Sequence, residues 1–381
     1  MRQSVLLLFV AVAALCILCC NCRCSAPQGS PNATDRVGGT SPLPLAQIAT
    51  APSGESVELT APNPLLDASF QTTTTEHFVL FHEPGACYVA GACRTLEYAY
   101  EYFYDVFSKA GFDLSRSKDR LVWICFPRKS GFSRYALLAE GMDLSWLDGY
   151  YSTLTNRVAV VQGDQKARRL EEAVPLSGSG PEPVVGADRS LREGVLAMAA
   201  GQQFDVTRLT HEVAHQLSFN SGIQKRGVMY PLWISEGLAT NFEFDGTSSA
   251  GLEHCNTARC NGLLEAHAAG GLVPLRQFVV QTTVSTDLHV GRRYYAQAWG
   301  FFQFILAEHP ESLRICLQLA AKNHPDHRDA TTMLAEFTEA FGAPDALEES
   351  WKAFLVRQAQ QASASRSTDS AVPNAGATRM P

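Results

Sequence analysis

The sequence predicts an α+β domain in which a small mixed sheet, with a hairpin at its edge, is followed by a mainly helical C-terminal lobe. Three observations predict this class. Up to residue 161, short apolar segments with strand periodicity alternate with segments of helical periodicity. Between Asp205 and Asn220, an amphipathic helix carries two histidines four residues apart. After Gly246, apolar residues recur mainly at helical spacing.

Residues 1–26 have the pattern of an export signal. A positive start at Met1-Arg2 precedes an apolar core from Leu6 to Leu18, and small residues at Ser25-Ala26 allow cleavage. Five cysteines crowd this segment, so two outcomes stay open. One is simple cleavage with release, and the other is a lipoprotein with the lipid attached at a cysteine, Cys20 being the candidate. We expect an exported protein of the periplasm or cell envelope, anchored to the membrane by its lipid in the second case.

Two further segments have compositions that do not support a packed core. Residues 27–74 are rich in Pro, Ser, Thr, Gly and Ala and predict a flexible tether. Residues 361–381 are small and polar and predict a disordered tail. Between them, residues 75–360 are long enough for one two-lobed domain with a core. Within it, 163–203 has a Ser-Gly-Pro composition that fits either a disordered insertion or a lid over a cleft.

Strands and helices alternate in the first half of the domain. Tyr100, Phe103, Tyr104 and Phe107 form one aromatic helix face, which we expect in the core. In order, we expect a strand at 76–82, a helix at 96–110, a buried strand at 121–126, a helix at 132–139 and a hairpin of 149–153 with 157–161. The helices expected in the second half are 260–269, 274–282, 293–308, 311–322, 328–341 and 345–360.

His211 and His215 lie four residues apart on the predicted helix, so both imidazoles can point at one spot. Glu212 is about 100° round the helix, where it can reach a metal-bound water without being a ligand. This H-E-x-x-H pattern supplies two zinc ligands and a general base. Asp205 as an N-cap and Asn220-Ser221-Gly222 as a stop agree with the helix. The alternative is a surface helix with two unrelated histidines.

A third ligand is available on the next predicted helix. A tetrahedral zinc needs one more protein ligand and one open position. Glu236 is the acid in the opening turns of the apolar segment from Pro231 to Asn241, beside Gly237, which lets another backbone approach. An exposed helix glutamate is the alternative, and the apolar setting argues against it.

These motifs resemble a known group of enzymes. His-Glu-x-x-His followed by Trp-Ile-Ser-Glu-Gly-Leu-Ala resembles the gluzincin metallopeptidases, the thermolysin-like and aminopeptidase-like group whose third zinc ligand is a glutamate on the next helix. Residues 215–220 with 231–241 are similar, more narrowly, to a bacterial family of exported, peptidase-like proteins of undefined activity. The resemblance implies a zincin-like fold with one Zn²⁺ ion. By residue match, the ligands are His211, His215 and Glu236, and the general base is Glu212.

The same resemblance implies a donor that stabilises the oxyanion of the tetrahedral intermediate. In the aminopeptidase-like branch this is a tyrosine well after the glutamate. Here we prefer Tyr295, with Tyr294 as the alternative; packing against Trp299 is the competing role for either. By the same analogy, an edge strand within 149–161 holds extended peptide substrate by main-chain pairing. No Gly-x-Met-Glu-Asn stretch of the aminopeptidase type occurs, which favours an endopeptidase.

Three hypotheses on function remain. The first is zinc-dependent hydrolysis of peptide bonds, and the second is a zinc hydrolase of other acyl substrates. The third is a catalytically inactive envelope protein that uses a peptidase fold as a binding scaffold. The intact ligands and base favour an enzyme. The net charge of -7 without a basic stripe argues against nucleic acid as a partner. With the peptidase hypothesis we expect a peptide or protein substrate, and we expect a monomer.

Six cysteines follow the export signal. The close pairs Cys87 with Cys93 and Cys255 with Cys260 are candidates for local disulfides in an exported protein. Cys125 and Cys316 lie in apolar segments, which fits buried free thiols. No C-x-x-C spacing occurs after the signal, which argues against a cysteine zinc site.

Overall fold

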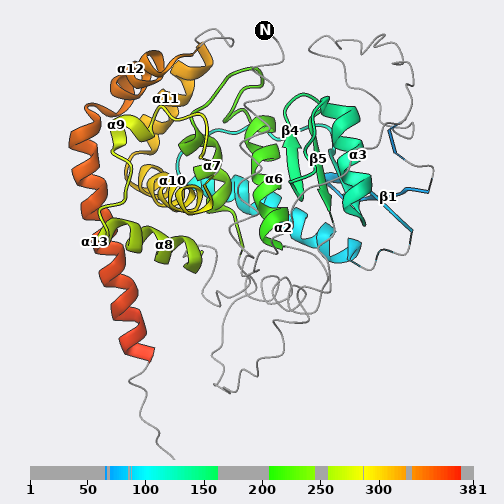
Figure 1. Cartoon of the computed structure of the whole chain (residues 1–381), viewed down its shortest axis with the longest axis horizontal. Helices are drawn as coiled ribbons and strands as arrows, with labels where there is room; N and C mark the ends of the chain where they lie inside the picture. Colours follow the sequence, from blue (N-terminus) through cyan, green and yellow to red (C-terminus); the bar gives the residue numbers. More distant parts are fainter. Residues whose placement is uncertain are drawn as a thin grey trace, which may run out of the picture.

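The computed structural model describes residues 65–66, 69–84, 86, 88–161, 206–244, 256–285, 287–322 and 328–369. A five-stranded sheet lies on one side of the molecule, and a group of helices lies on the other (Figure 1). The helices α6 (Val206–Asn220) and α7 (Leu232–Asn241) lie between these two parts. The expected α+β class is therefore confirmed, with the helical part in the C-terminal half.

The sheet is mixed and has the strand order β1-β2-β3-β5-β4. Its strands are β1 (Gln71–Thr74), β2 (Phe78–His82), β3 (Leu121–Phe126), β4 (Gly149–Ser152) and β5 (Arg157–Val161). The three inner strands are parallel, whereas β1 and β4 pair antiparallel at the two edges. The predicted strands and the edge hairpin are confirmed. The tether was predicted to reach residue 74, which is wrong, because β1 pairs with β2; its row of threonines gave no apolar alternation to reveal it.

The central strand β3 separates two cores, which explains why all six of its residues are buried. Successive side chains of a strand point to opposite faces. Trp123 and Cys125 face the large core with α2 and α6, while Val122 and Ile124 pack with α3 (Lys129–Glu140). A strand buried on both faces reads as a continuous apolar run, as predicted for this segment.

Helix α2 (Val89–Lys109) covers the sheet on the side of α6. Its expected aromatic face is confirmed, since Tyr100, Phe103, Tyr104 and Phe107 are all buried. The helix begins seven residues earlier than predicted, because small side chains of its first turns pack in the core, as Ala92 does, without an apolar period. This helix forms the layer against which the histidine helix packs.

The C-terminal half contains six helices within the described residues. They are α8 (Thr257–Ala268), α9 (Leu275–Phe278), α10 (Leu288–Glu308), α11 (Pro310–Lys322), α12 (Ala330–Phe341) and α13 (Pro344–Asp369). Three boundaries differ clearly from prediction. Helix α9 ends at Phe278, four residues before the predicted end at 282, and the carbonyl of Gln281 accepts from the N–H of Leu232 at the start of α7. Helix α10 starts at 288 because Asp287 caps it, accepting from the backbone N–H groups of His289 and Val290. Helix α13 continues to 369, into the predicted tail; its small polar residues are helix-compatible although they offer no apolar face.

Helices α7 and α10 cross at very close range, which Gly237 makes possible. A Cβ at Gly237 would lie 2.7 Å from the carbonyl oxygen of Ala298 and 2.9 Å from the Cβ of Phe302. Asn241 adds a polar link, because its Nδ2 donates to the carbonyl of Trp299 at 2.9 Å. Gly237, next to Glu236, therefore allows the close packing of α7 against α10, as expected from the sequence.

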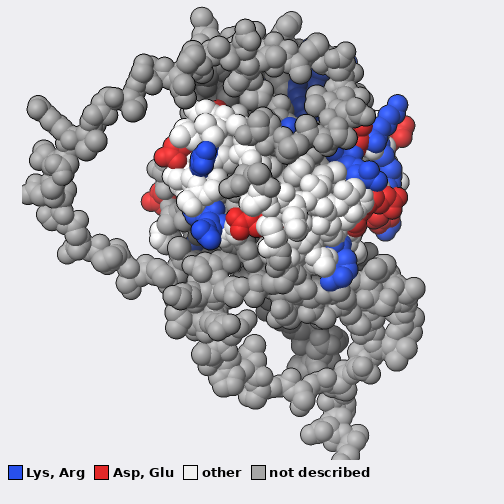
Figure 2. All heavy atoms as spheres, turned by 90° about the vertical axis from the view of Figure 1, so that its right-hand side faces the viewer, with Lys and Arg blue, Asp and Glu red and all other residues white. Residues whose placement is uncertain are grey.

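The side of the sheet that α3 covers presents a mixed surface. Basic and acidic side chains are interspersed among a larger uncharged area of the described atoms (Figure 2). Helix α3 and the loop after it carry three exposed large apolar side chains, Leu137, Leu138 and Trp146. This face lies across the sheet from α6 and takes no part in the site below.

Several predicted segments fall outside the described residues. They are the export signal 1–26, most of the tether 27–74, the insertion 163–203 and the end of the tail 361–381. Among the helices that are described, none combines the length and apolar character needed to cross a membrane.

Candidate metal centre

The helix α6 brings two imidazoles into the interior. His211 and His215 are 3% and 6% exposed, and their Nε2 atoms face each other at 3.1 Å. The helix is held against the sheet by Gln216, whose Oε1 accepts from Trp123 Nε1 at 2.8 Å and whose Nε2 donates to the carbonyl of Asn156 at 3.1 Å. The residue after the second histidine therefore anchors the helix, and the anchor sets the direction in which the histidines point.

A buried polar bridge sets the spacing between α6 and α7. Ser218 Oγ donates to Gln224 Oε1 at 2.6 Å, and Gln224 Nε2 donates to Ser235 Oγ at 2.9 Å. All three side chains are buried. Since Ser235 precedes Glu236, the bridge places the glutamate opposite the second histidine of α6.

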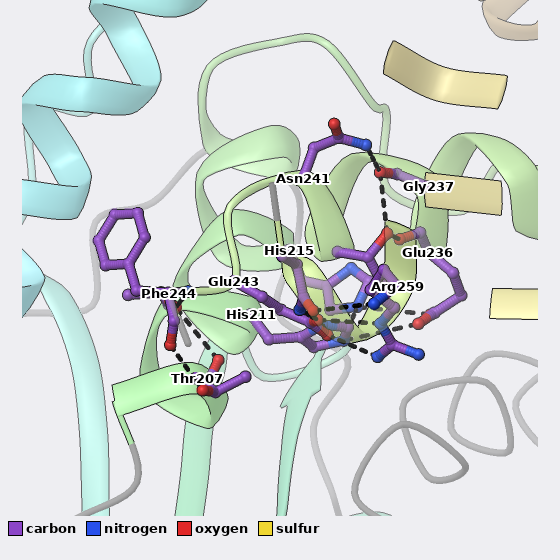
Figure 3. Close-up of polar contacts among 12 residues, drawn as sticks. Thr207, His211, His215, Glu236, Gly237, Asn241, Glu243, Phe244 and Arg259 are labelled. Carbon is purple, nitrogen blue, oxygen red and sulfur yellow. Dashed lines mark hydrogen bonds and ion pairs between the residues drawn. The ribbon is translucent and has the colours of Figure 1, made fainter. Parts of the chain in front are cut away.

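Glu236, fully buried, completes a triangle with the two histidines (Figure 3). His211 Nε2 lies 3.5 Å from Glu236 Oε2, and His215 Nε2 lies 3.4 Å from Glu236 Oε1. A tetrahedral ion with bonds of about 2.0–2.1 Å separates its ligand atoms by about 3.3 Å. The Nε2–Nε2 separation of 3.1 Å is close to this value, and the two nitrogens lie 3.5 and 3.4 Å from different oxygens of the Glu236 carboxylate, Oε2 and Oε1. The three residues can therefore hold a metal ion, with every ligand atom within 4.8 Å of the others.

The carboxylate of Glu212 lies beside this triangle. It is 0% exposed, and neither of its oxygens has a hydrogen-bond partner among the described residues. Burial raises the pKa of this carboxyl, and the positive charge of His211 and His215 acts in the opposite direction. A buried acceptor left without a donor is costly unless it serves chemistry. Its place next to the predicted ligands fits a group that receives a proton.

Glu243 lies behind His211, at a position that no sequence pattern identified. Glu243 Oε1 lies 3.0 Å from His211 Nδ1. The carboxylate is held in turn by Arg259, whose Nη2 and Nε donate at 2.9 and 3.1 Å, and by Asn256 Nδ2 at 2.9 Å. Accepting from Nδ1–H leaves the Nε2 lone pair free for a metal, which is the usual arrangement of ligating histidines.

The segment that carries Glu243 is fixed to α6 by two threonines. Thr207 Oγ1 donates to the carbonyl of Phe244 at 2.6 Å, and the N–H of Phe244 donates to Thr210 Oγ1 at 3.1 Å. Phe242 and Phe244 on either side are buried among aromatic rings of α2. The only sign of this role in the sequence is that Glu243 stands between two phenylalanines, seven residues after Glu236.

The two glutamates of the centre are held ionised. Burial works to raise the pKa of Glu236, but the adjacent His215 and His211 outweigh it and lower the pKa to about 2. Burial likewise opposes ionisation of Glu243, and Arg259 and His211 lower its pKa below the usual range. Both carboxylates are therefore negative at neutral pH, as a cation site requires.

The structure separates the two candidate tyrosines. Tyr294 is buried, its hydroxyl has no hydrogen-bond partner among the described residues, and burial and the charge of Glu236 raise its pKa. Tyr295 lies next to Arg259, whose guanidinium carbon is 5.5 Å from the ring centroid. The charge of Glu236 therefore acts on the Tyr294 hydroxyl, whereas the Tyr295 ring lies near the arginine that holds Glu243.

The predicted pairing of Cys87 with Cys93 is wrong, because the Cys93 thiol is free, whereas the pairing of Cys255 with Cys260 stays a prediction, because Cys255 lies outside the described residues. Cys93, Cys125 and Cys316 are buried free thiols. This agrees with the expectation for the last two.

Comparison with known sequences adds one finding. The model of a family described as protein of unknown function (DUF1570) matches residues 205–327, less than half of the chain. The matched region contains all the residues of the centre described above. No curated protein matches the chain.

Proposed function

We propose that this protein is a zinc-dependent hydrolase, and that its substrates are peptides. One observation carries the proposal: the buried side chains of His211, His215 and Glu236 converge closely enough to hold one metal ion, beside the carboxylate of Glu212, which has no hydrogen-bond partner among the described residues. Two imidazoles and one carboxylate are the ligand set of the gluzincins, which the sequence resembles.

Zinc fits these residues better than the common alternatives. Mg²⁺ and Ca²⁺ prefer six or more oxygen ligands, whereas this site offers two nitrogens. When bound, zinc supplies Lewis acidity and lowers the pKa of a water molecule toward neutrality. Three protein ligands also leave a position open for that water or for substrate.

The chain's own groups then have distinct tasks. Glu212 takes a proton from the attacking water and later delivers it to the leaving amine, which its raised pKa favours. Tyr294 donates its buried hydroxyl to the oxygen that becomes negative in the transition state. Glu243 keeps His211 in the tautomer and orientation that present Nε2 to the metal.

An enzyme fits this centre better than an inactive scaffold. A metal that only stabilised the fold would be fully served by four protein ligands. Among the described residues, no fourth ligand is present and the fully buried carboxylate of Glu212 has no hydrogen-bond partner. A scaffold gains nothing from that unpartnered group.

Metal analysis tests the proposal directly. Purified full-length protein is expected to carry one zinc per chain and to cleave members of a randomised peptide library, detected by mass spectrometry. A chelator should abolish cleavage, and added zinc should restore it. Stoichiometric zinc with no cleavage in any peptide pool would instead establish the scaffold, and absence of zinc affinity would contradict the centre itself.

The two tyrosines give a second, matched test. Tyr294→Phe is expected to lower kcat by about 10- to 1,000-fold with little change in KM, because it removes a donor to the transition state. Tyr295→Phe should change kcat no more than a few-fold. Steady-state kinetics on a cleaved peptide from the library measure both. A large loss for Tyr295→Phe alone would return the role to that residue, as the sequence first suggested.

A further inference from the structure

A cavity of about 680 Å³ lies between α8 and the first turns of α10. Its wall includes Asn256, Arg259, Glu265, His289, Arg292 and Arg293. Arg259 is neutralised by Glu243, but Arg292 and Arg293 outnumber the exposed Glu265, so the wall is basic in a chain whose net charge is -7. The volume is in the range of small-molecule and side-chain sites in proteins.

Arg293 is the wall residue whose guanidinium is exposed to a ligand in the cavity. It is exposed and makes no hydrogen bond or ion pair with a described residue, and it lies across from the end of α8, where a Cβ at Gly271 would be 3.2 Å from its Nη1. Asp287, at the start of the same helix, accepts from two backbone N–H groups as the N-cap; these hydrogen bonds lower the pKa of its carboxyl, and the nearby charges of His289 and Arg293 add to this. The guanidinium fork suits the two oxygens of a carboxylate.

Two residues of the cavity wall also contact the metal centre. Asn256 and Arg259 line the cavity and also donate to Glu243, which lies 3.0 Å from His211. Two hydrogen-bonded contacts therefore join the cavity wall to a metal ligand. A substrate group in the cavity would be held at a fixed position relative to the bond that is cleaved.

We propose that this cavity binds a carboxylate group of the peptide substrate, with Arg293 as a recognition residue and Arg292 beside it. The inference rests on the proposed function and names the class of substrate for it, peptides recognised through a carboxylate. The carboxylate is either the free C-terminus or an acidic side chain, since both present the same two oxygens.

Binding of matched peptide pools tests the inference. The protein is zinc-loaded, full-length Glu212→Gln, which binds without cleaving, and the probes are fluorescent randomised short peptides. One pair of pools differs only in a C-terminal carboxylate or carboxamide. A second, amidated pair contains glutamate or glutamine at one position. We expect the carboxylate member of at least one pair to bind about ten-fold tighter. A preference in the first pair assigns the C-terminus, and a preference in the second alone assigns a side chain.

The arginine variants decide whether the cavity is responsible. Arg293→Gln should remove the preference for the carboxylate pool, while Arg276→Gln, an exposed arginine on α9, should keep it. Equal binding of both members in both pairs, or a preference that survives Arg293→Gln and Arg292→Gln, would overturn the inference. If the preference depends on Arg293 while the wild-type protein cleaves no peptide, this inference stands and the proposed hydrolase fails. If the wild-type protein cleaves peptides but binds both members of each pair equally, the hydrolase stands and this inference fails.

Discussion

Replacing Glu212 with glutamine is expected to lower kcat by about 100- to 10,000-fold while leaving one zinc ion bound per chain. The amide has the same volume as the carboxylate but cannot accept the proton of the attacking water. It also does not disturb the ligand triangle, to which Glu212 contributes no atom. Steady-state kinetics and metal content on the same preparation measure the two effects together.

The same variant has a second readout that needs no substrate. The Glu212 carboxylate is fully buried and has no hydrogen-bond partner among the described residues. An uncharged glutamine amide costs less free energy to bury than a carboxylate, so Glu212→Gln should raise the thermal stability of the metal-free protein. A loss of stability would mean that the carboxylate has a structural role.

Glu140→Gln is the matched control for removing a buried acid. Glu140 is 5% exposed in α3 and accepts from Ser152 Oγ at 3.1 Å, on an element that supplies none of the ligands. Its substitution should leave kcat unchanged. Wild-type turnover by Glu212→Gln would remove the general base from the mechanism, and an equal loss in both variants would point to folding.

The metal triangle could be predicted from sequence because each ligand is tied to a local pattern. His211 and His215 are fixed relative to each other by helix geometry alone. Glu236 needed only the inference that one further helix follows within a short gap. The bridge from Ser218 through Gln224 to Ser235, which sets that gap, carries no pattern of its own and appears only in three dimensions.

Residues placed by tertiary contacts could not be predicted. Glu243 reaches His211 because Thr207 and Thr210 hold its segment against α6, and Arg259 reaches Glu243 from another helix. Likewise, the side chains of Tyr294 and Tyr295 leave α10 in directions about 100° apart. The way α10 crosses α7 determines that the charge of Glu236 acts on Tyr294. Periodicity identifies a helix, but it does not give the rotation of that helix about its axis.

Substitution of Glu236 by glutamine is expected to lower zinc affinity by more than about 100-fold. The amide retains the volume but lacks the charge of a ligating carboxylate, and the loss should exceed the 10- to 100-fold typical of residues behind the ligands. Glu243→Gln is the comparison, since Glu243 also contacts His211 but through Nδ1. Competition with a chromogenic chelator measures both affinities. A larger loss for Glu243→Gln would show that it, and not Glu236, is the third ligand.

In the metal-free protein, we expect Glu243→Gln to lower the stability more than Glu236→Gln does, which is the reverse of their order in zinc affinity. Glu243 neutralises the buried guanidinium of Arg259, at 2.9 Å from its Nη2. Removing one partner of a buried ion pair costs on the order of 3 kcal/mol, so Glu243→Gln should unfold at clearly lower denaturant concentration. At a pH at which the imidazoles of His211 and His215 are neutral, the attraction that lowers the pKa of Glu236 is absent, so replacing Glu236 should then cost the metal-free protein much less. A ligand and its positioning residue are thus distinguished by opposite rankings in affinity and in stability.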